Sequence, residues 1–373
     1  MHIIRRIFLI ISEALYQLIA RLFIFRMSAQ QSHKRMISLL SRLDGISPVI
    51  ALLRLLHRLL FRKHQIEVGG VTLPHPFILA AGMVKGHGFE TEKEALAAVN
   101  DGTNIIPGWR SVPALVGLVE FGSFTFHPRL GNPGVVMWRD RKTKSTQNRV
   151  GLTNPGAKAA AQFLGRNREH LPQQFGINIA VSPGVDDLEQ QKTEVVGSIA
   201  LFILQSIQPT WFTLNLSCPN TEDDPGGNQT AEQARQLCGE FVDWLRKSGV
   251  DTPVWVKVSP GLADEQYNIL LQTFAETGVQ AVIATNTIAQ PTPDNPNVMA
   301  GVAGGRLYAE TLKTVTTLNR LNNEHGYNID IIACGGVLDS ETYRSFMQNG
   351  AKAVQYWSAL VYRGPLAAAI IDG

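Results

Sequence analysis

The feature that most constrains the fold is a series of eight short apolar segments that alternate with amphipathic stretches. The apolar segments are residues 77–82, 121–126, 175–182, 211–218, 254–259, 281–287, 329–336 and 353–359. Helical periodicity marks residues 187–206, 231–247, 264–277 and 308–322. Buried strands joined by helices form a parallel sheet, and eight of them favour closure. We therefore predict an α/β fold in which residues 66–373 form a (β/α)8 TIM barrel.

Two parts of the predicted barrel need separate treatment. Residues 66–73 resemble a short hairpin with Gly69–Gly70 at its turn. Residues 88–120 are longer than one crossover helix requires. The pattern leaves open whether this stretch contains an extra strand around Asn104–Pro107.

Residues 1–65 form a separate N-terminal extension with its own composition. They hold eleven lysines and arginines against two acidic residues, whereas the whole chain has a net charge of only +3. A basic, apolar extension on a mildly acidic remainder of the chain indicates that the extension binds an anionic surface. Nucleic acid is disfavoured, because leucine, isoleucine and phenylalanine dominate the same stretch.

The first part of the extension predicts an amphipathic helix over residues 3–25. Its apolar positions follow helical spacing, and its polar positions lie on the other side: Ile4, Phe8, Ile11, Leu15, Leu18 and Leu22 against Arg5, Ser12, Gln17 and Arg21. The longest unbroken apolar run is Ile7–Ile11, far short of the roughly 20 residues that span a bilayer. The pattern is typical of a helix that lies in the membrane interface.

Two more helices are predicted at residues 33–43 and 47–63, with a break at Asp44–Gly45. One interpretation is a helical hairpin that packs on the body through its leucines. The other is a membrane-docking cap that faces lipid. The two interpretations are compatible.

The cysteines exclude several classes of site. Cys218, Cys238 and Cys334 form no CxxC pair and no close set with histidine, so neither a four-cysteine cluster nor a cysteine-rich zinc site is expected. We predict no metal, and an odd count of isolated thiols favours a reducing compartment. Cys238 and Cys334 are interpreted as small buried hydrophobes.

Polar residues at or just beyond the ends of the predicted strands indicate the functional site. They are Lys85, Asn178, Asn215, Lys257 and Asn286. In a (β/α)8 barrel the carboxyl ends of the strands converge on one face, where active sites lie. One buried asparagine alone would be an ordinary satisfied core residue, but five polar residues at corresponding ends favour a site.

A set of motifs in this order resembles the dihydroorotate dehydrogenase family over roughly residues 66–371. The motifs are AAGMVK (80–85), NRVGLTN (148–154), NLSCPNT (215–221), VWVKVSPGL (254–262), ATNT (284–287), ACGG (333–336) and YWSALVYRGP (356–365). The N-terminal helical extension is similar to that of the membrane-associated, quinone-using class. The resemblance implies FMN as cofactor and dihydroorotate as substrate. It also implies a quinone as electron acceptor and a peripheral location on the cytoplasmic side of a membrane.

The same resemblance implies the roles of particular residues in FMN binding. Lys257 would stabilise negative charge on the reduced ring, and glycine pairs would bring backbone N–H groups to the phosphate. The implied FMN-binding residues are Ala81, Gly82, Lys85, Ser123, Asn178, Asn215, Lys257, Thr285, Gly304, Gly305, Gly335, Gly336, Trp357 and Ser358.

Substrate binding and proton abstraction are implied in the same way. Cys218 stands at the position of the catalytic base, which removes the substrate C5 proton. The implied substrate-binding residues are Lys85, Asn148, Arg149, Val150, Gly151, Leu152, Asn215, Asn220, Asn286 and Thr287. Lysine and asparagine suit a carboxylate on an amide-rich ring, because together they offer donors and acceptors.

Three positions depart from the pattern of the quinone-using class. That class carries serine where Cys218 stands and an arginine-rich stretch of which only Arg139 is kept, and the family carries tyrosine where Trp357 stands. Two alternatives therefore stay open: a related FMN barrel that acts on another pyrimidine or an unsaturated carbonyl compound, and a catalytically silent flavin-fold scaffold.

Overall fold

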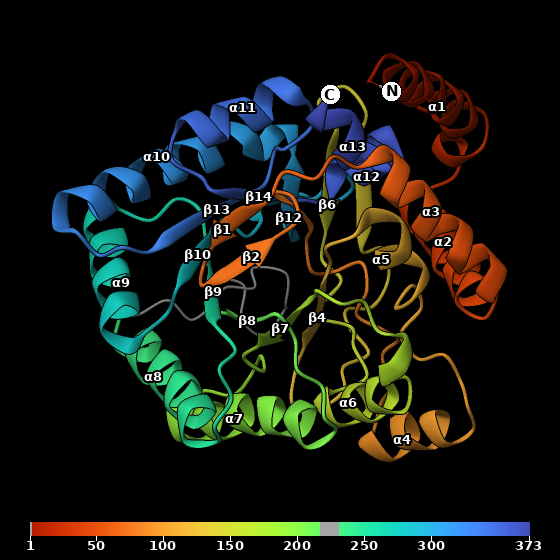
Figure 1. Cartoon of the computed structure of the whole chain (residues 1–373). Helices are drawn as coiled ribbons and strands as arrows, with labels where there is room; N and C mark the ends of the chain where they lie inside the picture. Colours follow the sequence, from red (N-terminus) through yellow and green to blue (C-terminus); the bar gives the residue numbers. More distant parts are fainter. Residues whose placement is uncertain (1, 217–230) are drawn as a thin grey trace.

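An eight-stranded parallel barrel occupies the centre of the molecule (Figure 1). The computed structural model describes residues 2–216 and 231–373. The barrel strands are β3 (Phe77–Leu79), β4 (Glu120–Phe124), β7 (Gly176–Ala180), β8 (Trp211–Asn215), β9 (Val254–Val258), β10 (Ala281–Ala284), β13 (Asp330–Cys334) and β14 (Ala353–Tyr356). The barrel closes between β3 and β4, where the Leu79 N–H donates to the Leu118 carbonyl at 2.9 Å. The predicted barrel is confirmed, and each predicted apolar segment overlaps one of these strands.

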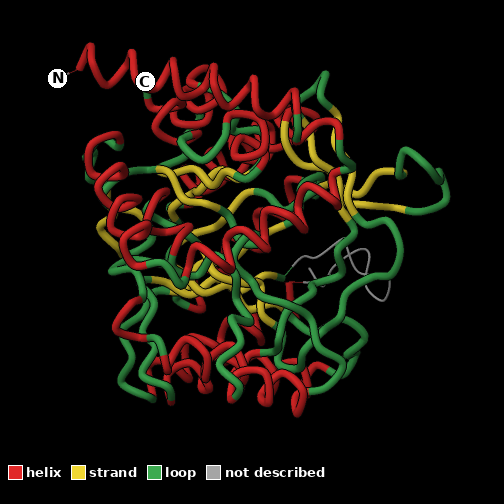
Figure 2. The backbone as a smooth tube through the Cα atoms, turned by 90° about the vertical axis from the view of Figure 1, so that its right-hand side faces the viewer, coloured by secondary structure: helices red, strands yellow, loops and turns green. Residues whose placement is uncertain are grey.

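Helices surround the barrel on its outer side (Figures 1 and 2). They are α4 (Glu92–Asn100), α6 (Ala157–Arg166), α7 (Leu188–Leu204), α8 (Ala231–Lys247), α9 (Asp264–Thr277), α10 (Tyr308–His325) and α11 (Ser340–Gln348), and the chain ends in α12 (Ser358–Arg363) and α13 (Ala367–Asp372). The main hydrophobic core lies between the strands and these helices. The four predicted amphipathic stretches correspond to α7, α8, α9 and α10.

A second, smaller core lies inside the barrel. Trp211 and Trp255 stack there, with ring centroids 4.5 Å apart. The predicted hairpin, β1 (Ile66–Val68) and β2 (Val71–Leu73), covers one end of the barrel, in front of the strands in Figure 1. The Gly69 carbonyl accepts a hydrogen bond from Trp255 Nε1 at 2.9 Å, and φ of +55° at this turn favours glycine.

The stretch 88–120 contains helices and no extra strand. The structure describes all of these residues and places α4 and α5 (Ser111–Val116) there, with turns between them. Helix α5 packs against the N-terminal helices. The length of this stretch therefore serves to dock the N-terminal extension.

A four-stranded antiparallel sheet lies outside the barrel and was not predicted from the sequence. It is formed by β5 (Met137–Asp140), β6 (Ser145–Asn148), β11 (Ile288–Pro291) and β12 (Met299–Gly304), in the order β11-β12-β6-β5. Most of its residues are polar, small or half-buried, so no apolar run marks the strands.

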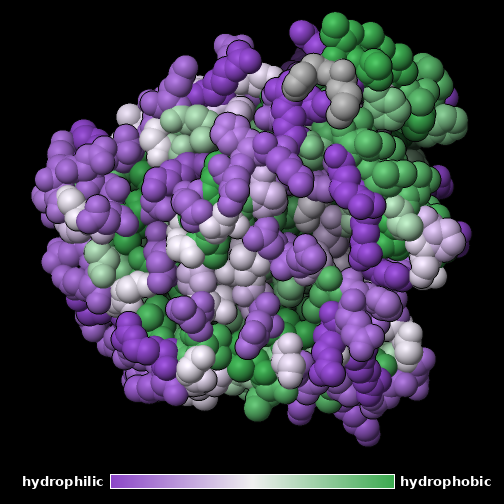
Figure 3. Space-filling model, in the orientation of Figure 1, coloured by the Kyte–Doolittle hydropathy of each residue, from purple (hydrophilic) through white to green (hydrophobic). Residues whose placement is uncertain are grey.

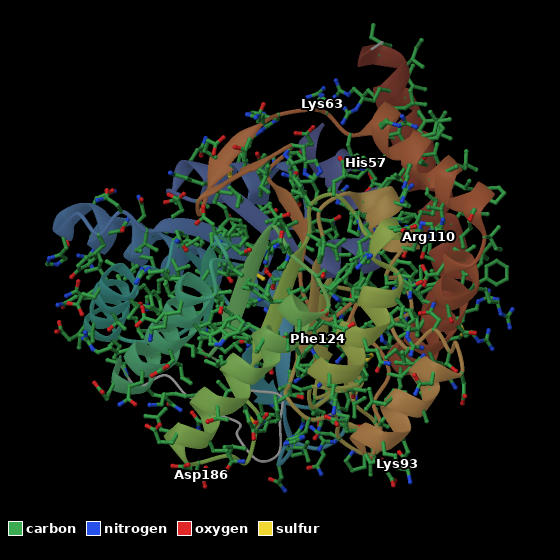
Figure 4. The ribbon with its side chains drawn as sticks, turned by 60° about the horizontal axis from the view of Figure 1, so that its bottom comes forward. His57, Lys63, Lys93, Arg110, Phe124 and Asp186 are labelled. Atoms are coloured by element: carbon green, nitrogen blue, oxygen red, sulfur yellow. The ribbon has the colours of Figure 1, made fainter. Side chains whose placement is uncertain are left out.

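The N-terminal extension forms helices that we call the cap (residues 2–60). They are α1 (His2–Leu22), the short 3-10 helix η1 (Ile24–Arg26), α2 (Ala29–Asp44) and α3 (Ser47–Leu60). The last two form a hairpin bent by 104° at the predicted break. The hairpin packs on the barrel body, where the Arg110 guanidinium donates to the Asp44 carbonyl at 3.2 Å (Figure 4 shows Arg110 beside the cap helices).

Helix α1 packs through its polar side on α3 of the cap and on the C-terminal helices of the barrel. Arg5 donates to the carbonyl oxygens of Leu60 at 2.7 Å and Gly373 at 2.9 Å, and Tyr16 donates to that of Val361 at 2.8 Å. Because the polar side is turned inward, the apolar side faces outward: Ile4 is 74% exposed and Ile11 is 60% exposed. Figure 3 shows the resulting hydrophobic surface over the cap, at the upper right.

Candidate active site

The carboxyl ends of adjacent barrel strands bring the predicted polar residues together. Register pairs Asn178 with Thr213 across β7 and β8, and Asn215 with Lys257 across β8 and β9. Side chains two residues apart on a strand share a face, so Lys257 lies one layer above the stacked Trp255. The strand pattern therefore places amides and an ammonium directly above the apolar floor of the barrel.

Lys257 is buried, and its ammonium has two described partners. It donates to Gln355 Oε1 at 3.2 Å and to Cys334 Sγ at 3.2 Å. Burial raises the pKa of the Cys334 thiol, although the nearby Lys257 charge opposes that rise. A buried ammonium must be hydrogen-bonded, and these contacts hold Lys257 at the cavity floor.

Asparagines and hydroxyls form the wall beside Lys257. Asn215 donates to Ser123 Oγ at 3.4 Å, and Asn286 donates to Asn215 Oδ1 at 3.5 Å. Thr285 donates to the Asn286 carbonyl at 2.7 Å. These bonds connect β4, β8 and the residues directly after β10 (Ala281–Ala284) into one polar wall.

One cavity of about 500 Å³ opens from this wall, and we call it the active-site cavity. The predicted residues that line it are Ala81, Gly82, Lys85, Ser123, Asn148, Val150, Gly151, Leu152, Asn178, Asn215, Lys257, Thr285, Asn286, Thr287, Gly304, Gly335, Gly336, Trp357 and Ser358. Arg149 and Gly305 are not among the described lining residues; Arg149 instead donates to the Pro133 carbonyl at 3.2 Å. Cys218 and Asn220 lie outside the described residues.

Glycine turns and a helix start meet beside the last two barrel strands. Gly335 and Gly336 follow β13, and Ser358 begins α12 directly after β14. Gly335 and Gly336 have φ of +120° and +81°, and a Cβ on Gly335 would lie 2.6 Å from Leu307. Loops after the seventh and eighth strands, with a short extra helix, form the usual phosphate site of such barrels. The turns here are therefore suited to an anion.

The outer part of the active-site cavity is apolar and is walled by the cap. Its lining there includes Met36, Leu39, Leu40, Leu43 and Leu53. His33 of α2 also lines it, and burial lowers the pKa of His33 to about 4, with the Lys85 charge as a second cause. The cavity therefore passes from a polar floor to an apolar outer wall.

Sequence reasoning missed three residues of the hydrogen-bond network around Lys257. Glu120, Gln355 and Cys334 join the Lys257 network, although Cys334 had been interpreted as a plain buried hydrophobe. Gln355 is a polar residue inside an apolar strand, and this pattern could have identified it as a site residue. Cys238 does lie in the core, within α8, where burial raises the pKa of its thiol.

The fold and the site define a (β/α)8-barrel enzyme with a cofactor-sized cavity at the carboxyl ends of its strands. Residues 64–373 match the family model described as dihydroorotate dehydrogenase. The chain belongs to the dihydroorotate dehydrogenase family, a family of flavin-dependent oxidoreductases.

Relatives and solved structures agree with this assignment. The chain is 30% identical to a dihydroorotate dehydrogenase (quinone) of Chloroflexus aurantiacus, over 95% of this chain and 94% of that protein. It is 29% identical to a protein of the same description from Thermobifida fusca, over 94% of this chain and 89% of that protein. The crystal structure of DHODH from Eimeria tenella in complex with ferulenol has a TM-score of 0.67 at 21% identity, covering 92% of this chain and 90% of that one, and supports the fold.

Proposed function

We propose that the protein oxidises dihydroorotate to orotate in pyrimidine biosynthesis, with FMN as the first electron acceptor and a membrane quinone as the second. The observation that carries this proposal is the continuity of the active-site cavity. It joins a floor of lysine and asparagine to an apolar passage between the cap helices. A polar ring substrate and a lipid-soluble oxidant require these two environments.

The described residues fit FMN. Asn178 is fully buried, and its Oδ1 has no hydrogen-bond partner among the described residues. An unpaired buried acceptor costs about 1–3 kcal/mol, which a ring N–H of FMN would relieve. Bound FMN supplies the hydride acceptor. Lys257 would offset negative charge on its ring, and the Gly335–Gly336 turn and the start of α12 would hold its phosphate.

Family resemblance supports the assignments for the substrate. Lys85, Asn148, Asn215 and Asn286 line the active-site cavity and offer one cation and three amides to a carboxylate and a ring. We propose that Cys218 takes the C5 proton as general base. Asn215, which lines the cavity, ends β8 three residues before Cys218 in the sequence.

The orientation of α1 supports a peripheral membrane location, which we propose is on the cytoplasmic side. By length and composition Ile3–Arg26 could cross a bilayer. A crossing would break the bonds of Arg5 and Tyr16 to the carbonyl oxygens of Gly373 and Val361 in the barrel. Insertion of the exposed apolar side into one leaflet keeps these bonds and places the cavity beside the lipid. We accordingly propose two units, the extension (1–65) and the catalytic barrel (66–373).

Titration of the flavin absorbance with dihydroorotate under anaerobic conditions tests the proposal. We expect stoichiometric bleaching, followed by recovery on addition of a quinone analogue. Bleaching by another pyrimidine or by an unsaturated carbonyl compound, but not by dihydroorotate, would identify a related enzyme. No bleaching by any of them would indicate a silent scaffold.

A further inference from the structure

Glu120, the first residue of β4, is a carboxylate fully buried inside the barrel. Its Oε1 accepts from Asn178 Nδ2 at 2.8 Å, and its Oε2 accepts from Thr213 Oγ1 at 2.7 Å. Oε2 also accepts from Gln355 Nε2 at 3.0 Å and from Trp211 Nε1 at 3.1 Å. Four donors therefore compensate for the desolvation of this carboxylate.

The carboxylate determines which way two amide groups point. A carboxylate can only accept hydrogen bonds, whereas an amide has a donor end and an acceptor end. Asn178 and Gln355 must therefore turn their NH2 groups toward Glu120. Their oxygen atoms are then turned away from Glu120. Gln355 Oε1 accepts from Lys257 at 3.2 Å, and the buried Asn178 Oδ1 has no hydrogen-bond partner within the part of the chain that the structure describes.

We propose that Glu120 is a positioning residue that orients Asn178 toward the cofactor and Gln355 toward Lys257. Asn178, Gln355 and Lys257 line the active-site cavity, whereas Glu120 is not among its described lining residues. Glu120 therefore acts through the side chains that it orients. This inference rests on the proposed binding of FMN.

Substitution of Glu120 by glutamine separates orientation from charge. Glutamine keeps the shape of the side chain, but one of its two ends is a donor. In Glu120→Gln the side chain therefore cannot accept all four hydrogen bonds, from the two amides and from Thr213 and Trp211. We expect the Kd of the full-length apoprotein for FMN, measured by flavin fluorescence quenching, to rise at least about tenfold, as for a lost buried hydrogen bond. If only the charge of Glu120 mattered, the Kd for FMN would fall instead, because removal of a buried anion favours binding of an anionic phosphate.

Thr213→Val is the matched control. It removes one hydrogen bond to the same carboxylate but leaves both amides oriented. We expect a lower thermal midpoint and an unchanged Kd for FMN. An equal rise of Kd in Thr213→Val, or the parental Kd in folded Glu120→Gln, would overturn the proposal.

Gln355→Met tests the second amide, and it applies even if Glu120→Gln does not fold. The exchange changes no charge and removes the Gln355 acceptor from Lys257. We expect a lower midpoint potential of bound flavin, because Lys257 is then less well placed to offset negative charge on the ring. An unchanged potential would overturn this part of the proposal. A parental protein that binds no FMN would instead refute the proposed function.

Discussion

The Asp44 carboxylate accepts two hydrogen bonds from Ser111, at 2.8 Å from its backbone N–H and at 2.7 Å from its hydroxyl. Asp44 ends α2 of the cap, and Ser111 begins α5 of the barrel body. Both residues are buried, and Ser111 also lines the active-site cavity. The contact therefore holds the apolar outer wall of the cavity in place.

Replacement of Asp44 by alanine should loosen the cap. The exchange leaves the N–H groups of Gly108 and Ser111 without their acceptor, and each unsatisfied buried donor costs about 1–3 kcal/mol. We expect a lower free energy of unfolding in urea and a larger loss of quinone turnover than of flavin reduction. Asp243→Ala, at an exposed carboxylate of α8, is the control. Equal unfolding midpoints for the two variants would contradict this role.

His75 should make the protein less stable in mild acid. Burial, and secondly the neighbouring His57, lowers the pKa of His75 from 6.5 to about 4. The unfolded chain therefore binds a proton that the folded protein does not, and stability falls as pH drops from 6.5 toward 4. The slope from one such group reaches about 1.4 kcal/mol per pH unit.

Urea unfolding measures the effect at pH values between about 4.5 and 7.5, a range that covers most of the interval in which His75 titrates. We expect His75→Phe to flatten the pH dependence, because the phenyl ring stays among Phe61 and Phe77 without a titrating group. His170→Gln, at an exposed position, should leave the dependence unchanged. Identical slopes for the parent and His75→Phe would rule out His75 as the cause.

Cys218→Ala should retain FMN and slow flavin reduction by about 10²–10⁴-fold, the usual effect of losing a general base. Cys218→Ser should keep activity with its pH optimum moved upward, because a hydroxyl is a weaker acid than a thiol. Rapid mixing with dihydroorotate measures both effects. Cys238→Ala, in the core of α8, controls for loss of a thiol. Parental reduction rates in Cys218→Ala would disprove the assignment.

The outward face of α1 should bind lipid. Deletion of residues 1–26 should release the protein from anionic vesicles and impair quinone turnover more than flavin reduction. A sharper variant is Ile11→Ser with Leu15→Ser, because both side chains are exposed and the contacts of Arg5 and Tyr16 to the barrel remain. We expect weaker vesicle flotation with an unchanged rate of flavin reduction.

Leu204→Ser is the control for loss of an exposed leucine, since Leu204 is 78% exposed on α7. High salt should weaken the binding of the parent without abolishing it, because apolar insertion persists when charges are screened. Equal flotation of the parent and the double variant would exclude α1 as the lipid contact.

Local sequence patterns were sufficient to predict the barrel and most of the residues around its cavity. Each barrel strand is a buried apolar run, and each run ends where a polar residue such as Asn215 or Lys257 begins the site. Because parallel strands present their carboxyl ends on one face, the position of a residue along its strand already places it near the others. The hairpin at Gly69–Gly70 was visible for a similar local reason.

Contacts between distant segments were decided only by the tertiary structure. The sequence marks Glu120 as a lone acid beside an apolar run, but its four donors come from three other strands. It marks Arg5 as the polar side of a helix, but not that this side faces the barrel and the chain terminus. Local periodicity reports which side chains share a face, whereas the partner of that face depends on how the whole chain packs.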